Sequence, residues 1–298
     1  MSLVATLICN PADPALDSTI VDGARAVLPS PGPAQWLFDE VAVDIPFTGS
    51  EDIAAIVTLL REARGDLPID IVVQPQAFRR KKLFLADMDS TMIGQECVDE
   101  LADFAGLKAH VAAITERAMR GDIAFEPALR ERVALLEGLP VSVIEEVLRE
   151  RIKLTPGART LIATMRTNGV RTCMVSGGFT HFTDRIAAMI GFDENRANSL
   201  TVVDGHKLAG RVAEPIFGRD GKRAALIELR TELGLAKDDT MAIGDGANDL
   251  NMILEAGLGI AFHAKPKVAA EAPARIDHGD LTALLYVQGY RREEFVQA

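Results

Sequence analysis

The chain of 298 residues contains little cysteine, few aromatic residues, no long hydrophobic run and no excess of positive charge. Its three cysteines, Cys9, Cys97 and Cys173, lie far apart without CxxC spacing, so neither a disulfide framework nor a zinc site is predicted. The net charge of −11 argues against nucleic acid and anionic membranes as partners. No apolar run approaches the roughly 20 residues that span a bilayer, and the N-terminus lacks the basic segment of a signal peptide. We therefore expect a soluble, cytoplasmic protein.

The chain has the composition of a globular protein, with 48% apolar and 25% charged residues. Residues 1–78 show a pattern of secondary structure that differs from the rest. Strands are predicted at 2–9, 36–47 and 67–73, and helices at 15–28 and 50–63. Ser50 is the expected cap of the second helix, with Glu51 and Asp52 at its start. This order predicts a small α+β module of ferredoxin-like type. It resembles the amino-acid-binding modules called ACT domains, and whether it binds serine, forms a homodimer or only packs stays open.

Residues 79–298 are expected to form a second, larger domain. The basic run Arg79-Arg80-Lys81-Lys82 is interpreted as a solvated linker leading into it. Residues 96–151 read as helices broken at glycines, which predicts a helical cap inserted after the first strand. Strands and helices then alternate, which predicts an α/β fold with a doubly wound parallel sheet and ligands at the carboxyl ends of its strands. Asp204-Gly205, between the segments 200–203 and 207–212, predicts a β-hairpin.

Two aspartates follow the first strand of that sheet, in the stretch Leu83-Phe84-Leu85-Ala86-Asp87-Met88-Asp89. Carboxylates at this spacing repel each other unless a cation shares their charge, and Mg²⁺ is a common solution. Asp87, at the strand end, is the predicted nucleophile for phosphoryl transfer, and Asp89 the predicted general acid and base. The alternative is a capped turn after a core strand.

Two further turns and one lysine are expected at the same edge of the sheet. Ser176-Gly177-Gly178 offers a hydroxyl and free N–H groups that suit a phosphate oxygen, although such turns are common without a ligand. In Gly244-Asp245-Gly246-Ala247-Asn248-Asp249, Asp245 is the expected direct metal ligand, with Asp249 behind it; a helix cap is the alternative. Lys222, near a helix start, could balance the phosphoryl charge or be a solvated surface lysine.

The order DxDST, SGG, a helix-starting lysine and GDGAND resembles the haloacid dehalogenase superfamily of phosphatases. The segments ECVDELADFAG, ITERAMRGDIAFEPALRERVALLEGLP and GDGANDLNMILEAGLGIAFHAKP resemble its phosphoserine phosphatases in particular. The resemblance covers roughly residues 83–283. It implies that Mg²⁺ is held by Asp87, Asp245 and the backbone carbonyl of Asp89. It also implies that phosphate is held by Ser176, Gly177 and Lys222, with Asn248 contacting substrate or phosphate.

The resemblance also implies which residues choose the substrate. Glu96 would bind the ammonium of phosphoserine and Arg132 its carboxylate, with Met119 and Phe125 as apolar walls. An arginine suits a carboxylate because its guanidinium can bind both oxygens. Without the resemblance, Glu96 and Arg132 read as helix-surface charges.

The expected activity is therefore Mg²⁺-dependent hydrolysis of O-phospho-L-serine to L-serine and phosphate, the last step of serine biosynthesis. One alternative is a related phosphatase or phosphotransferase acting on another small phosphomonoester. The other is an amino-acid sensor whose phosphatase-like half is inert, which the four residues Asp87, Asp89, Lys222 and Asp245 disfavour.

Overall fold

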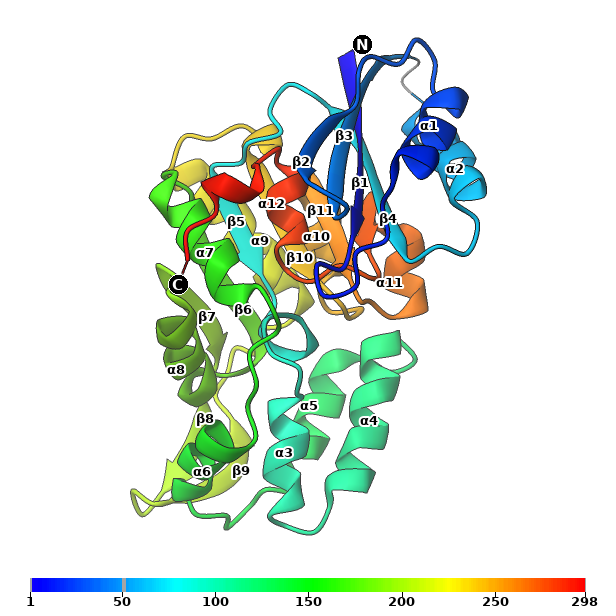
Figure 1. Ribbon diagram of the computed structural model, residues 1–298. Coiled ribbons are helices and arrows are strands. Elements are labelled where there is room, and N and C mark those ends of the chain that lie inside the picture. The colour runs from blue at the N-terminus through cyan, green and yellow to red at the C-terminus, as the bar shows by residue number, and fades with distance from the viewer. Residues whose placement is uncertain (1, 50–51, 298) are drawn as a thin grey trace. The chain divides into compact units, whose positions relative to one another are not determined.

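The computed structural model describes residues 2–49 and 52–297 (Figure 1). The chain divides into two compact units. The first consists of Met1–Lys82, Pro156–Val170 and Ala274–Ala298, and the second of Leu83–Thr155 and Arg171–Pro273. The chain therefore leaves and re-enters the first unit twice. Whether residue 78 ends a domain that folds by itself stays a prediction.

The N-terminal part of the first unit is an antiparallel sheet with two helices. Its strands pair in the order β2-β3-β1-β4, which is the order of a ferredoxin-like βαββαβ module and confirms the predicted topology. The α2 helix is capped by Asp52, whose carboxylate accepts the N–H of Ala55; the predicted cap Ser50 and the neighbouring Glu51 lie outside the described residues. The elements are β1 (Ser2–Cys9), α1 (Ser18–Val27), β2 (Gln35–Phe38), β3 (Ala42–Thr48), α2 (Ile53–Arg64) and β4 (Ile69–Pro75).

Three later elements complete this unit: α7 (Ala158–Thr167), β12 (Ala274–Ile276) and α12 (Ala283–Val287). The α12 helix contacts β1, and β12 contacts β4. The carboxylate of Asp70, on β4, accepts backbone N–H groups of Asp277, His278 and Gly279 just after β12. The C-terminal segment is thus tied to the N-terminal sheet by burial and by hydrogen bonds.

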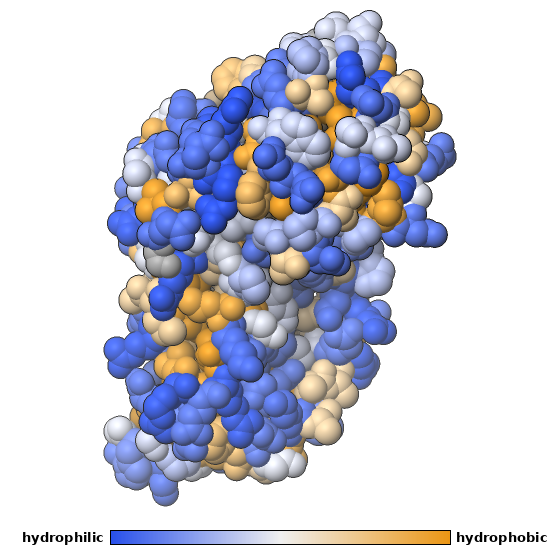
Figure 2. All heavy atoms as spheres, in the orientation of Figure 1, coloured by the Kyte–Doolittle hydropathy of each residue, from blue (hydrophilic) through white to orange (hydrophobic). Residues whose placement is uncertain are grey.

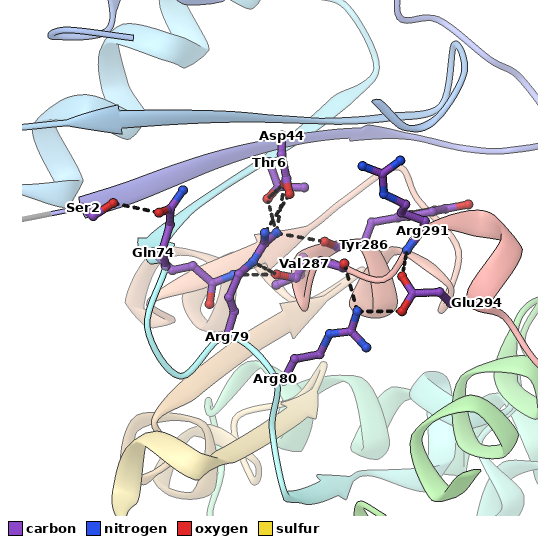
Figure 3. A network of polar contacts seen from close by, with 12 residues as sticks. Ser2, Thr6, Asp44, Gln74, Arg79, Arg80, Tyr286, Val287, Arg291 and Glu294 are labelled. Carbon is purple, nitrogen blue, oxygen red and sulfur yellow. Dashed lines mark hydrogen bonds and ion pairs between the residues drawn. The ribbon is translucent and has the colours of Figure 1, made fainter. Parts of the chain in front are cut away.

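Two residues of the basic run at 79–82 are part of this packing, so its interpretation as a solvated linker is wrong for Arg79 and Lys81, whereas Arg80 and Lys82 are exposed. The guanidinium of Arg79 binds both carboxylate oxygens of Asp44, at 2.7 and 2.9 Å, and donates to the carbonyls of Tyr286 and Val287 (Figure 3). The Arg79 side chain is only 15% exposed, and Lys81 is buried. A cation suits this place because the last carbonyls of α12 have no partner within the helix.

The second unit contains the predicted parallel sheet, whose strands pair in the order β11-β10-β5-β6-β7. Apolar residues of β5 and β6, including Leu85 and Val175, pack against Leu226 and Leu229 of α9 in one core cluster. The elements are β5 (Leu83–Ala86), β6 (Arg171–Phe179), α8 (Thr180–Ile190), β7 (Glu194–Asn198), α9 (Arg219–Glu232), β10 (Thr240–Gly244), α10 (Leu250–Glu255), β11 (Leu258–Phe262) and α11 (Pro266–Glu271).

Apolar periodicity predicts neither β7 nor α11. The β7 segment, ENRAN, has one apolar residue and is the last strand of the sheet, where polar side chains support it. Arg171 pairs with Glu194, and the hydroxyl of Thr183 donates to Asn195. The α11 helix has only six residues and begins at Pro266, so its periodic signal is too short to recognise.

Between β5 and β6 lies the predicted helical insertion. It contains α3 (Cys97–Asp103), α4 (Lys108–Arg120), α5 (Phe125–Ala134) and α6 (Ser142–Glu150). The α4 helix contacts both α3 and α5, and the three lie side by side (Figure 1). The hairpin formed by β8 (Leu200–Val203) and β9 (Lys207–Val212), predicted from Asp204-Gly205, joins this insertion through two backbone bonds between Leu208 and residues Gly138 and Leu139.

Hydrophilic residues cover most of the face shown in Figure 2, with smaller groups of hydrophobic residues between them. Scattered apolar residues at a surface are ordinary. In the described part of the chain, no helix combines the length and the apolar character needed to cross a bilayer.

Candidate active site

The site forms where β5 leaves the sheet between its neighbours β10 and β6. Asp87, directly after β5, is buried, and its N–H donates to the carbonyl of Ile243 on β10. The chain then turns sharply, with Ser90 in the left-handed region at a φ of 55°. This turn brings Asp89 back toward the sheet, where one carboxylate oxygen accepts the N–H of Cys97 at 3.0 Å and the other lies 3.5 Å from the hydroxyl of Ser176.

Three buried carboxylates meet at this edge: Asp87, Asp245 and Asp249 each offer an oxygen, and these oxygens lie within 4.8 Å of one another. The turn after β10 fits tightly around them, since a Cβ added at Gly244 would overlap the Asp249 side chain. The sequence placed Asp249 behind Asp245, whereas the structure makes it a full member of the cluster. A group of hard oxygens at this separation suits a divalent cation.

Lys222 lies against the same carboxylates. Its Nζ is 2.5 Å from Asp87 Oδ1 and 2.6 Å from Asp249 Oδ1, and its side chain is completely buried. The alternative of a solvated surface lysine is therefore wrong. Burial by itself would lower the pKa of Lys222, but the charges of Asp249 and Asp87 outweigh burial and raise that pKa, so the ammonium group stays charged.

One lysine does not balance the whole cluster. Burial, followed by the charge of Asp249, raises the pKa of Asp87 well above its ordinary value, although Lys222 opposes this rise. Burial and the charge of Asp249 also raise the pKa of Asp245, to about 7. Both carboxyl groups thus resist ionisation unless further positive charge is supplied, and a bound cation would supply it.

The third polar turn, at the end of β6, lies beside the first. The Ser176 hydroxyl accepts the N–H of Gly178 at 2.9 Å, and the carbonyl of Gly177 accepts from the side-chain amide of Asn198. Gly177 also touches the insertion, because a Cβ there would lie 2.5 Å from Cζ of Phe125. A side chain larger than hydrogen at Gly177 would push Phe125 away.

A cavity joins these strand ends to the helical insertion. Twelve residues line it, namely Asp87, Asp89, Glu96, Val98, Met119, Phe125, Leu129, Arg132, Gly177, Gly178, Phe179 and Asn248. The predicted walls Met119 and Phe125 are therefore both present. Asn248 leaves its buried Oδ1 without a hydrogen-bond partner in the described structure, so this oxygen is available to a ligand.

The two predicted substrate-choosing charges lie in the same cavity. Glu96 accepts the hydroxyl of Ser90 at 2.7 Å. Arg132 is only 2% exposed, so it is not the helix-surface charge that its position in α5 suggests. Its Nε donates to the carbonyl of Ala128 at 3.1 Å, and its Nη1 to the hydroxyl of Thr115 at 3.0 Å.

All the predicted site residues thus lie at one sheet edge or in the cavity beside it. Sequence reasoning missed three polar residues that support them: Ser90, Asp99 and Thr115. Ser90 belongs to the DxDST motif, and Asp99 lies three residues after Glu96, so both carried a signal in the sequence, namely closeness to a predicted site residue. Thr115 carried none, since it is an ordinary residue of an apolar helix face.

The chain is similar to proteins of known family. The family model of haloacid dehalogenase-like hydrolases matches residues 84–254, more than half of the chain. The phosphoserine phosphatase of Polaromonas sp. is 50% identical over 209 residues, which are 68% of this chain and 88% of that relative.

Two solved structures are similar as well. A HAD family hydrolase of Salmonella enterica serovar Typhi superposes with a TM-score of 0.84 at 28% identity, covering 96% of this chain and 98% of that one. A phospho-aspartyl intermediate analogue of phosphoserine phosphatase superposes with a TM-score of 0.66 at 40% identity, covering 70% of this chain and 98% of that one. The chain therefore belongs to the haloacid dehalogenase-like hydrolases, and within them to the phosphoserine phosphatases.

Proposed function

We propose that the protein hydrolyses O-phospho-L-serine to L-serine and phosphate, as the last step of serine biosynthesis. The observation that carries this proposal is the cavity, where Glu96 and Arg132 face the same space as Asp87 and Asp89. Phosphoserine has an ammonium and a carboxylate besides its phosphate, and a buried pocket must pair both charges. One anion and one cation beside a carboxylate nucleophile match this substrate.

In the proposed reaction, a carboxylate oxygen of Asp87 attacks phosphorus while the bond from phosphorus to the serine oxygen breaks, giving an aspartyl-phosphate. The carboxyl group of Asp89 donates its proton to the leaving serine oxygen. Water then attacks the aspartyl-phosphate, Asp89 takes up the water proton, and phosphate and free Asp87 result. The bond from Lys222 to Asp87 supports this assignment, because it favours the ionised carboxylate that attack requires.

The phosphoryl group would be held by the Ser176 hydroxyl, the Gly177 N–H, the Lys222 ammonium and the Asn248 amide. Lys222 neutralises part of the negative charge, and the hydroxyl and N–H groups orient the phosphoryl oxygens for in-line attack. The unpartnered oxygen of Asn248 supports a contact with substrate at this position. An oxygen can only accept, so the partner would be a hydroxyl or ammonium hydrogen unless the amide is turned to present its N–H₂ group.

Phosphatases of this family depend on a metal ion, and we propose Mg²⁺. Asp87, Asp245 and the backbone carbonyl of Asp89 would hold it, with Asp249 beside them. The cluster of buried oxygens and the raised pKa values of Asp87 and Asp245 fit such an ion. When bound, it would stabilise the negative charge that develops on the phosphoryl group.

The proposal is tested by phosphate release from phosphoserine and from phosphoethanolamine, which lacks the carboxylate. Asp87→Asn should abolish release from both substrates. Arg132→Ala should raise KM for phosphoserine about 100-fold but leave KM for phosphoethanolamine within about threefold, since a buried charge-assisted bond contributes about 3 kcal/mol. Arg130→Ala is the control, because Arg130 lies in the same helix but is exposed and pairs with Glu214.

The same assay distinguishes the proposed function from the alternative functions. Equal rates on phosphoserine and on unrelated sugar phosphates would indicate a broad phosphatase. Product esters formed in the presence of an added alcohol would indicate a phosphotransferase. No phosphate release from any substrate would favour the inert amino-acid sensor and refute the proposed function.

We further propose that the enzyme is cytoplasmic and forms a homodimer through its N-terminal module. The three cysteines are buried and unpaired, which suits a reducing compartment. The strand β2 ends the N-terminal sheet, so one of its edges is available to a second copy. Light scattering on the 298-residue chain tests the homodimer, and a monomer at all concentrations would refute it.

A further inference from the structure

Arg132 is held from one side only. Two of its nitrogens are occupied within the protein, Nε by the carbonyl of Ala128 and Nη1 by the hydroxyl of Thr115. Its other terminal nitrogen, Nη2, makes no hydrogen bond to any described residue, although the side chain is almost fully buried and lines the cavity. A guanidinium can bind a carboxylate with both terminal nitrogens, so this is the end that a substrate can reach.

The Thr115 hydroxyl also connects Arg132 to a second charged residue, Asp99. Its oxygen lies 2.6 Å from Asp99 Oδ1 and 3.1 Å from the carbonyl of Val111. A hydroxyl has one hydrogen to donate, and the shorter bond to a carboxylate is the stronger. The hydrogen therefore goes to Asp99, while the oxygen accepts from Arg132. Asp99, Thr115 and Arg132 form a chain that crosses α3, α4 and α5, and all three side chains are buried.

This chain of hydrogen bonds counters an attraction that would otherwise hinder substrate binding in the pocket. Glu96 and Arg132 have opposite charges when both are ionised and line one cavity, yet no ion pair joins them among the described residues. Ser90 engages Glu96, and Thr115 engages Arg132. If the two charges met, each would neutralise the other, and the ammonium and carboxylate of a substrate would have to displace an existing ion pair.

We propose that Asp99 and Thr115 are positioning residues that hold Arg132 away from Glu96, and so make the pocket selective for phosphorylated α-amino acids. The inference rests on the proposed function. Thr115 supplies the geometry, because its hydroxyl fixes one terminal nitrogen of the guanidinium. Asp99 supplies the charge, because its carboxylate competes with Glu96 for the guanidinium without entering the cavity.

The test compares phosphoserine with phosphoethanolamine as substrates of the 298-residue chain with Mg²⁺. Thr115→Val keeps the size of the side chain but removes the hydroxyl, and should raise KM for phosphoserine about tenfold, about 1.4 kcal/mol. KM for phosphoethanolamine and kcat for both substrates should stay within about twofold. Thr115→Ser restores the hydroxyl and should restore KM. Asp99→Asn keeps an acceptor but removes the charge, so its effect should be smaller and in the same direction.

Thr183→Val is the matched control. Thr183 is also buried and bonded to a side chain, Asn195, but lies in α8 and does not line the cavity. Its KM ratio for the two substrates should not change. Equal increases in KM for both substrates in Thr115→Val would overturn the inference. It would also be overturned if either Thr115→Val or Asp99→Asn left KM for phosphoserine unchanged. Failure of the unmodified protein to release phosphate from phosphoserine would instead refute the proposed function.

Discussion

Lys222 offers the sharpest test of the charge balance in this site. Its ammonium is completely buried and contacts two carboxylates, Asp87 at 2.5 Å and Asp249 at 2.6 Å. Lys222→Met removes the charge but keeps an unbranched side chain of similar length, so the surrounding packing should change little. The two carboxylates are then left facing each other, with no neighbouring cation in contact.

The size of the effect follows from the burial. Removing one partner of a buried ion pair costs about 3–5 kcal/mol, because the remaining charge stays out of water. The free energy of unfolding measured in EDTA should fall by that amount. The loss should be smaller with Mg²⁺, since a bound cation offsets the same carboxylates. The value of kcat/KM should fall about 1000-fold, since about 4 kcal/mol of charge stabilisation corresponds to about three powers of ten.

Urea unfolding and phosphate release measure the two effects. Lys108→Met is the control, because Lys108 forms an ion pair with Glu100 at 2.8 Å but its side chain is 42% exposed. Exposed pairs contribute about 0–1 kcal/mol, so the control should stay close to the unmodified protein in both assays. Activity of Lys222→Met within tenfold of the unmodified protein would show that Lys222 is not the required counter-charge.

Two further predictions concern pH and the first unit. The raised pKa of Asp245, about 7, means that the folded state binds this proton more tightly than the unfolded state, where the carboxyl group titrates near about 4. The free energy of unfolding of the protein in EDTA should therefore fall as pH rises from about 4 to about 7, and Asp245→Asn should weaken that fall; an unchanged slope would contradict the shift. In urea unfolding, Arg79→Met should cost about 3–5 kcal/mol, because it leaves the buried Asp44 unpaired. Arg80→Met, at a side chain that is 44% exposed, should cost at most about 1 kcal/mol, and equal losses would show that the Arg79 network adds nothing specific.

The sequence alone was enough to predict the reactive edge of the sheet. Asp87, Ser176 and Asp245 each follow an apolar run, and parallel strands end at one edge, so these side chains had to converge. Element types followed from apolar periodicity and turn residues, as at β1 and at the β8–β9 hairpin, whose bounds agree with the structure. Both signals are local, because they depend on residues close together in the chain.

Only the tertiary structure decided which charges are buried and what they contact. Arg79 reads as a linker residue, but Asp44 and the end of α12, residues far away in the chain, enclose it. Arg132 reads as a helix-surface charge, but Thr115 and Asp99 on two other helices make it part of a cavity wall. Burial and pairing arise from packing between distant segments, and no periodic pattern in the chain records them.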